Sequence, residues 1–178
     1  MKITLIRHGE SEANVGRFIN DDPTKPVHLT PKGRTQAEVL AAELQGEHYT
    51  HAYVSEFPRA QETLNIVLRG RALKVQVDAR LNERKSGMDG QPVSAFNDQV
   101  KQNLLHFKTS KGESFVEQMQ RLREFLDEIA IRHPDEHVVA VAHENPILAA
   151  LGLTTSAEEV VEASLPNCGR VILTWPPV

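Results

Sequence analysis

The 178-residue sequence contains a single cysteine, Cys168, so the chain has no pair of thiols from which to form an internal disulfide. No apolar run approaches the ~20 residues that a membrane-spanning helix requires. The apolar start of the chain, residues 3–6, ends at Arg7 and is too short for the core of a secretion signal. These absences predict a cytoplasmic protein with no membrane partner.

Positive charge is not in excess either. Lysine and arginine total 20 against 24 aspartate and glutamate residues, which gives a formal net charge of −4. Because nucleic-acid-binding domains normally carry a basic patch or a basic balance, we expect no nucleic-acid partner. What is present is an ordinary globular composition, with 40% hydrophobic and 25% charged residues. At this length we expect one domain, residues 1–178, with a core of its own.

Short apolar runs alternate with helical patterns along the chain, which predicts an α/β fold. Thr30 and Pro31 suit the N-cap and the first turn of one helix. In residues 115–129 apolar side chains recur at intervals of three and four, which predicts one buried helix face. Residues 137–142 are almost continuously apolar, as in a strand that is covered on both faces. Further strands are expected at residues 2–7, 52–54, 73–77 and 170–175, and a further helix at 57–69.

Reactive side chains gather directly after the expected strands. Residues 7–11 read Arg-His-Gly-Glu-Ser, residues 55–59 end in arginine, residues 81–84 contain glutamate, and residues 143–146 begin with a second histidine. In an open parallel sheet, ligands bind beyond the carboxyl ends of the strands. The fold therefore brings histidine, arginine and glutamate to one edge of the sheet.

This combination of residue types suits the transfer of a phosphoryl group. Arginine pairs bidentately with phosphate oxygens, and a histidine can attack phosphorus to form a covalent intermediate. A carboxylic acid can supply the proton that the leaving oxygen needs. Because arginines neutralise the phosphate charge, no metal is required. We therefore expect a small phosphorylated substrate.

The motifs also follow one another in the order of a known family. They are residues 5–11 with Asn14, then residues 29–33, 54–59 and 81–83, and finally the second-histidine strand at 139–143. In these motifs the sequence resembles the histidine phosphatase superfamily, whose fold is phosphoglycerate-mutase-like. The resemblance implies a three-layer α/β/α architecture with a mostly parallel central sheet.

The resemblance implies a role for each matching residue. His8 would carry the phosphoryl group as a phosphohistidine, and Glu83 would protonate the leaving group and then activate water. The phosphate would be held by His8 itself and by the side chains of Arg7, Asn14, Arg59 and His143. No cofactor and no metal are implied, and inorganic phosphate would be the product. The expected activity is that of a metal-independent phosphomonoester phosphatase.

Two positions depart from the family pattern. Glu144 stands where the residue after the second histidine is commonly glycine. Its carboxylate either turns away from the phosphate or contacts a cationic or hydroxyl-bearing part of the substrate. Residues 88–90 read Met-Asp-Gly, where an aromatic residue and a glutamate usually precede the glycine. Residues 84–113 are expected to form a cap or side wall over the site.

Two other functions stay open on the sequence. A phosphoglycerate mutase primed by a bisphosphorylated cofactor would use the same histidine, although such mutases carry a longer insertion after Glu83. A non-catalytic module that binds phosphorylated ligands would keep the pocket without turnover, and Glu144 motivates this alternative. A zinc motif of the His-Glu-x-x-His type is absent, because Ile147 stands at its last position. The remaining histidines are interpreted as incidental: His28, His48, His51, His106, His133 and His137.

Overall fold

A computed structural model describes residues 1–177 of the chain. Its elements in chain order are β1 (Lys2–Arg7), α1 (Glu12–Gly16), α2 (Pro31–Glu43), β2 (His51–Val54), α3 (Pro58–Val67), β3 (Val75–Val77), the 3₁₀ helix η1 (Ala79–Leu81), α4 (Val93–Val100), α5 (Phe115–Arg132), β4 (His137–Ala142), α6 (Glu144–Gly152), α7 (Ala157–Val160) and β5 (Arg170–Thr174). Within this described part, none of the helices has the length and apolar character needed to cross a membrane.

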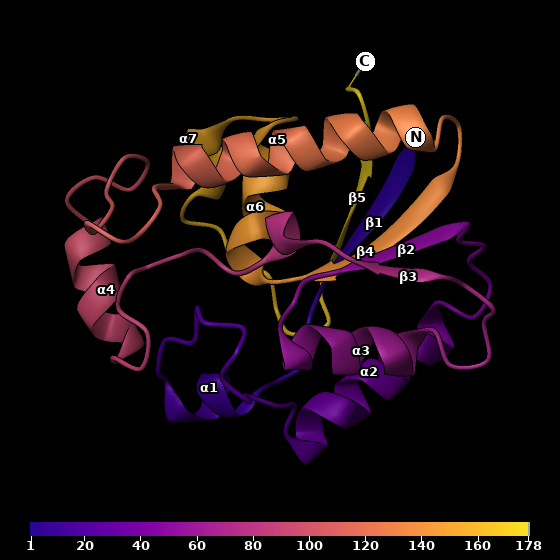
Figure 1. Ribbon diagram of the computed structural model, residues 1–178, viewed down its shortest axis with the longest axis horizontal. Coiled ribbons are helices and arrows are strands. Elements are labelled where there is room, and N and C mark those ends of the chain that lie inside the picture. Colours follow the sequence, from indigo (N-terminus) through magenta and orange to yellow (C-terminus); the bar gives the residue numbers. More distant parts are fainter. Residues whose placement is uncertain (178) are drawn as a thin grey trace.

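The central sheet contains five strands in the order β3-β2-β4-β1-β5. The first four of these strands run parallel to one another, and β5 runs antiparallel to β1. Helices α5 and α6 cover one face of the sheet, and α2 and α3 cover the other, which makes three layers (Figure 1). The predicted fold class, a mostly parallel sheet between helices, is therefore confirmed.

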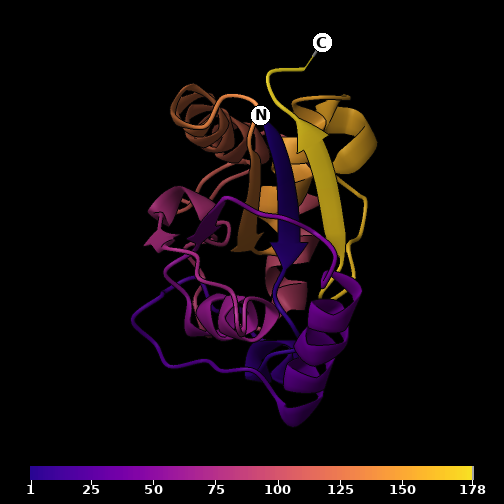
Figure 2. The same cartoon turned by 90° about the vertical axis from the view of Figure 1, so that its right-hand side faces the viewer.

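Alternation along the strands divides the core between the two faces. Ile3 and Leu5 of β1 pack against α5 and α6, whereas Ile6 packs against α2 and α3. In β4, residues 138–142 are all buried, which explains their continuous apolar sequence. At the far edge of the sheet, β1 and β5 lie side by side (Figure 2), and Lys2 at the start of β1 pairs with Thr174 at the end of β5.

The helix starts follow the capping residues in the sequence. Thr30 Oγ1 accepts a hydrogen bond from the Gly33 backbone N–H at 3.0 Å, so α2 begins as predicted. Ser114 and Glu117 form a reciprocal capping box at the start of α5. The expected stripe of α5 is buried except at Met119, which is partly buried; its buried members are Phe115, Leu122, Leu126 and Ile129.

Four short α-helices were not expected from the sequence, and there is a physical reason why each gives no clear sequence pattern. α6 is apolar nearly all round and buried, so it shows no amphipathic period. α1 and α7 are only five and four residues long. α4 lies within residues 84–113, the expected cap or side wall, and none of its residues is buried, so no buried face marks it in the sequence. Figure 1 shows α4 standing apart from the three layers, beyond the edge of the sheet.

Candidate active site

The side chains that the sequence singled out meet at the carboxyl edge of the sheet. β1 leads directly into His8, β2 leads into residues 55–59, and β4 leads into His143. Glu83 follows η1, which comes after edge strand β3. Because β4 lies between β1 and β2, the imidazoles of His8 and His143 come within 5.1 Å of each other, measured between ring centroids.

The ring of His8 is buried and oriented through both of its nitrogens. Nδ1 lies 2.7 Å from the Gly9 carbonyl oxygen, and because that oxygen can only accept, Nδ1 carries the proton. Nε2 is then left with its lone pair, to which Arg59 Nε donates at 3.2 Å. Burial, together with the charge of Arg59, holds the pKa of His8 well below its ordinary value. The imidazole is therefore neutral, and its unprotonated nitrogen accepts a hydrogen bond from a guanidinium.

The loop after His8 is fixed by close backbone packing. A Cβ atom at Gly9 would lie 2.4 Å from the Gly33 carbonyl oxygen, and one at Gly33 would lie 2.0 Å from the Glu10 carbonyl oxygen. The Gly9 N–H also donates to Thr63 Oγ1 at 3.1 Å. Both glycines are thus required where the first turn of α2 presses against this loop. This packing fixes the carbonyl that orients His8.

Arg59 is buried in the first turn of α3. Its Nη2 donates to the Asn20 carbonyl oxygen at 3.1 Å, and its Nη1 donates to the side-chain oxygen of the same residue. The guanidinium also lies over the Phe57 ring, 4.5 Å from its centroid. Burial lowers the pKa of Arg59 to about 10, which still leaves it charged at neutral pH. Asn20 was not found by sequence reasoning, because a polar residue in an irregular loop gives no pattern.

The loop that carries Asn20 is braced by the unusual segment at residues 88–90. Asp89 Oδ1 accepts from the Asp21 N–H at 2.9 Å, and the Gly90 N–H donates to the Ile19 carbonyl oxygen at 2.7 Å. Asp89, which belongs to a segment that departs from the family pattern, is therefore hydrogen-bonded to the loop that carries Asn20. Through that loop it supports the partner of Arg59.

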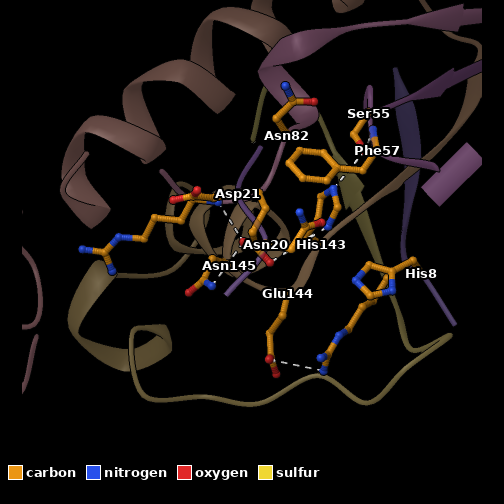
Figure 3. Close-up of polar contacts among 12 residues, drawn as sticks. His8, Asn20, Asp21, Ser55, Phe57, Asn82, His143, Glu144 and Asn145 are labelled. Carbon is orange, nitrogen blue, oxygen red and sulfur yellow. Dashed lines mark hydrogen bonds and ion pairs between the residues drawn. The ribbon is translucent and has the colours of Figure 1, made fainter. Parts of the chain in front are cut away.

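His143 is completely buried, and its hydrogen bonds indicate its tautomer. Ser55 Oγ accepts from the Phe57 N–H at 3.4 Å and lies 2.9 Å from His143 Nε2 (Figure 3). The hydroxyl proton of Ser55 can then point to Nε2, which leaves the ring proton on Nδ1. Burial lowers the pKa of His143 well below its ordinary value, so this ring is neutral too.

Two buried nitrogens at this edge have no hydrogen-bond partner within residues 1–177. They are His143 Nδ1 and Arg7 Nε. Buried polar atoms in folded proteins are almost always hydrogen-bonded. An anion with several acceptor oxygens would satisfy both nitrogens at once.

The Glu83 carboxylate lies beside His143. Its Oε1 accepts from the Arg84 N–H at 2.8 Å and from Asn145 Nδ2 at 3.2 Å. Its Oε2 faces His143 Nδ1 at 4.0 Å. Burial raises the pKa of Glu83 above that of an ordinary glutamate. A carboxyl group in this position retains its proton to higher pH than an exposed one.

Two other glutamates that follow these strands form hydrogen bonds or ion pairs with residues outside the predicted site. Glu10 accepts from Thr30 Oγ1 at 2.9 Å and pairs with Lys32 at 3.3 Å. Glu56 accepts from Asn82 Nδ2 at 2.6 Å. Glu83 is therefore better placed than either of them to exchange a proton at this site.

Glu144 turns its carboxylate away from His143 (Figure 3). Its Oε2 lies 3.2 Å from Arg7 Nη1, and its Oε1 accepts from the Leu165 N–H at 2.7 Å and from Ser164 Oγ at 3.0 Å. The Glu144 carboxylate is therefore bound by Arg7 and by residues 164–165, and it is not bound by His143. The pairing partly neutralises Arg7.

Asn14 lies at the exposed margin of the site. Its Oδ1 accepts from the Ser11 N–H at 3.0 Å and from Asn167 Nδ2 at 3.3 Å. Asn14 thus closes the capping box of α1, and its own amide nitrogen is the group that it can offer to a ligand.

Five of the six predicted site residues line one cavity of about 970 Å³: Arg7, His8, Asn14, Arg59 and Glu83. The sixth, His143, is completely buried and does not line it. The rest of its wall is mixed. It includes the apolar side chains of Phe18, Ile19, Phe96, Val100, Leu104 and Val161, and the polar or charged side chains of Arg17, Ser94, Asn97, Lys101 and Glu162. The segment that bears α4 is attached to the body of the protein by the buried Arg84, which donates to the carbonyl oxygens of Phe107 at 3.0 Å and Glu113 at 3.2 Å. A substrate would therefore meet the predicted site residues and also a wall that offers both apolar and charged side chains.

Comparison with known proteins identifies the family. Residues 3–177 match the histidine phosphatase superfamily (branch 1). The chain belongs to this superfamily. The match extends over nearly the whole chain and includes each of the motifs described above.

Relatives of this histidine phosphatase superfamily member include both phosphatases and mutases. An adenosylcobalamin/alpha-ribazole phosphatase from Escherichia coli is 32% identical over 158 residues, which cover 81% of this chain and 74% of the relative. A probable phosphoglycerate mutase from Yersinia enterocolitica is 30% identical over 135 residues, 71% of this chain but only 62% of the mutase. A mycobacterial glucosyl-3-phosphoglycerate phosphatase, solved in complex with VO3, has a TM-score of 0.84 and 26% identity, with coverage of 97% of this chain and 92% of that one.

Proposed function

We propose that this protein is a phosphomonoester phosphatase that acts through a phosphohistidine on His8. The observation that carries the proposal is the fixed tautomer of this ring. The Gly9 carbonyl holds the proton on Nδ1, so Nε2 keeps a lone pair at the inner end of the cavity. A nucleophile must be unprotonated at the pH of the reaction, and the lowered pKa of His8 meets that condition.

The phosphate would be bound by the nitrogens around His8. Arg59 Nε donates to Nε2, the atom that would attack phosphorus, and would transfer this hydrogen bond to a phosphate oxygen when substrate binds. Arg7 Nε and His143 Nδ1 are buried donors without hydrogen-bond partners among residues 1–177, and Asn14 Nδ2 can add a further hydrogen bond at the margin. Preorganised donors of this kind stabilise the charge on the phosphoryl oxygens as it is redistributed in the transition state.

The reaction would proceed in two displacements. In the first, His8 Nε2 forms a bond to phosphorus while the bond from phosphorus to the ester oxygen breaks, and the Glu83 carboxyl group gives its proton to that oxygen. In the second, the Glu83 carboxylate takes a proton from water, the water oxygen bonds to phosphorus, and the P–N bond breaks to release inorganic phosphate. The raised pKa of Glu83 supports its role as the acid in the first displacement. Residues 84–113 would act as the side wall that shapes access to both steps.

Hydrolysis can be separated from the two alternatives in one set of assays. We expect the wild type to release phosphate from p-nitrophenyl phosphate with EDTA present, and His8→Ala to lose this turnover. His106→Ala, at an exposed histidine outside the cavity, is the matched control. Phosphoglycerate interconversion that requires a bisphosphoglycerate primer and outpaces phosphate release would instead establish a mutase. Vanadate binding without turnover of any ester would establish a binding module.

A further inference from the structure

Two histidines and a glutamate cluster at the edge of the sheet opposite to the cavity. His51 begins β2, His133 directly follows the last residue of α5, and Glu136 directly precedes β4. This is the amino edge of the parallel strands, whereas the active-site cavity lies at their carboxyl edge. We propose that His51, His133 and Glu136 form a binding site for a divalent transition-metal ion of the zinc type, separate from the catalytic site.

The three side chains already have nearly the separations that one ion requires. The Oε2 atom of Glu136 lies 2.8 Å from His51 Nδ1 and 3.9 Å from His133 Nδ1. One ligand atom from each residue lies within 4.8 Å of the other two. With zinc–ligand bonds of about 2.0–2.1 Å, two ligands at a tetrahedral angle are about 3.3 Å apart. The observed distances lie on either side of that value. The rings of His51 and His133 are stacked, with centroids 3.7 Å apart and an interplanar angle of 26°. One imidazole must therefore rotate before both Nδ1 lone pairs can point at one ion.

His133 is held in the orientation that a metal ligand needs. It is buried, and its Nε2 lies 2.8 Å from the hydroxyl oxygen of the buried Tyr53. When Nε2–H donates to that oxygen, Nδ1 carries the lone pair and faces Glu136. Metal-binding histidines usually have this kind of second hydrogen bond, which fixes the tautomer and the ring plane.

A tight turn between α5 and β4 places Glu136 next to His51 and His133. Pro134 ends the helical stretch, and Asp135 adopts a left-handed conformation with φ of 59°. Glu136 Oε2 is buried, yet it accepts no hydrogen bond of ordinary geometry from the described residues, although His51 Nδ1 is close. A buried carboxylate oxygen without a hydrogen bond is unusual, and a bound cation would satisfy it.

The donor set and its exposure define the kind of ion. Two imidazoles and one carboxylate suit zinc and the neighbouring divalent metals cobalt, nickel and copper. The side chains of His51 and Glu136 are 33% and 35% exposed, so solvent can supply the remaining ligand. An ion here would link the end of α5 to the starts of β2 and β4, and we expect it to stabilise the fold without taking part in catalysis.

Metal binding can be measured without reference to activity. After treatment with EDTA and its removal, cobalt should give the visible d–d absorption of a protein-bound ion, and zinc should displace it. Zinc at about a hundredfold excess over its Kd should raise Tm by about 5 °C or more. His51→Ala and Glu136→Gln should each abolish the cobalt band and the Tm rise. His48→Ala, at an exposed histidine outside the cluster, should retain both.

The matched variants also define what overturns the proposal. If the wild type shows no cobalt band, or if His51→Ala keeps the full Tm rise, the cluster is only an ion pair with a stacked ring. Because His51 is partly exposed, we expect its alanine variant to fold, and a circular dichroism spectrum checks this. Hydrolysis of p-nitrophenyl phosphate by His51→Ala should equal that of the wild type, since the cluster lies outside the cavity.

Discussion

The Glu144 carboxylate forms an ion pair with the Arg7 guanidinium, with 3.2 Å between Oε2 and Nη1. The same arginine nitrogen also donates to the Leu165 carbonyl oxygen, and Glu144 accepts from the Leu165 N–H. Arg7 is therefore fixed to the protein through one end of its guanidinium, while its buried Nε has no protein partner within residues 1–177. A phosphate that binds here shares the charge of Arg7 with Glu144.

Replacing Glu144 by glutamine tests this sharing of charge. The amide keeps an acceptor for the Leu165 N–H but removes the negative charge that competes with the substrate. A partly exposed pair of this kind is worth about 1 kcal/mol, so KM for p-nitrophenyl phosphate should fall about fivefold with little change in kcat. Glu162→Gln, which neutralises an exposed carboxylate on the cavity wall, is the control. A rise in KM for Glu144→Gln would mean that the ion pair positions Arg7 rather than competes for it.

The proton-donor role of Glu83 predicts a dependence on the leaving group. A phenolate with a nitro group leaves readily without a proton, whereas an alkoxide does not. Glu83→Gln should therefore lose about 100-fold or more in kcat/KM on an alkyl phosphate, and clearly less on p-nitrophenyl phosphate. Glu56→Gln is the matched variant, because that carboxylate is bound to Asn82. Equal losses on both esters would show that Glu83 acts in binding rather than as an acid.

The pKa shifts of His8 and Glu83 predict a bell-shaped dependence of kcat/KM on pH. Protonation of His8 removes its lone pair, so kcat/KM rises with pH through a pKa that burial places below the ordinary value of 6.5. Loss of the Glu83 proton removes the acid, so kcat/KM falls through a pKa that burial raises above the ordinary value of 4.5. Measured on an alkyl phosphate, the falling limb should disappear in Glu83→Gln. If it persists unchanged in that variant, another group provides the proton.

Asn20 is predicted to support substrate binding through Arg59. Asn20→Ala removes the side-chain oxygen that holds one arm of the guanidinium and leaves a buried donor without its acceptor. We expect KM to rise about tenfold and the free energy of unfolding to fall by about 1–3 kcal/mol. Asn65→Ala, on the exposed side of α3, should change neither quantity. Wild-type kinetics in Asn20→Ala would show that the Asn20 backbone carbonyl and the Phe57 ring are enough to keep Arg59 in place.

The parts of the site that could be predicted from the sequence are those placed by strand ends. His8 and His143 each directly follow a buried strand, and parallel pairing then brings them together. Arg59 and Glu83 follow the other two parallel strands at short distances, so the same reasoning reached them. Strand ends therefore indicated these four residues and the α/β class, whereas Asn14 and the role of each residue came from the resemblance to the family.

Contacts between distant loops could not be predicted in this way. The direction of Glu144 depends on Leu165, which comes 21 positions later in the chain, and no local pattern connects the two. Asn20 reaches Arg59 across 39 positions from an irregular loop. For the same reason, His51 and His133 are interpreted as incidental on the sequence. Strand pairing and the end of α5 bring them together, and no spacing in the sequence indicates this.

The phosphohistidine itself is tested most directly by trapping it. Wild-type protein would be mixed with substrate, quenched in alkali within the first turnovers, and analysed by intact-protein and peptide mass spectrometry. We expect one phosphoryl group on His8, absent from His8→Ala, and longer-lived in Glu83→Gln because water is then not activated. Turnover with no such adduct, an adduct on another residue, or undiminished turnover by His8→Ala would contradict a mechanism through His8.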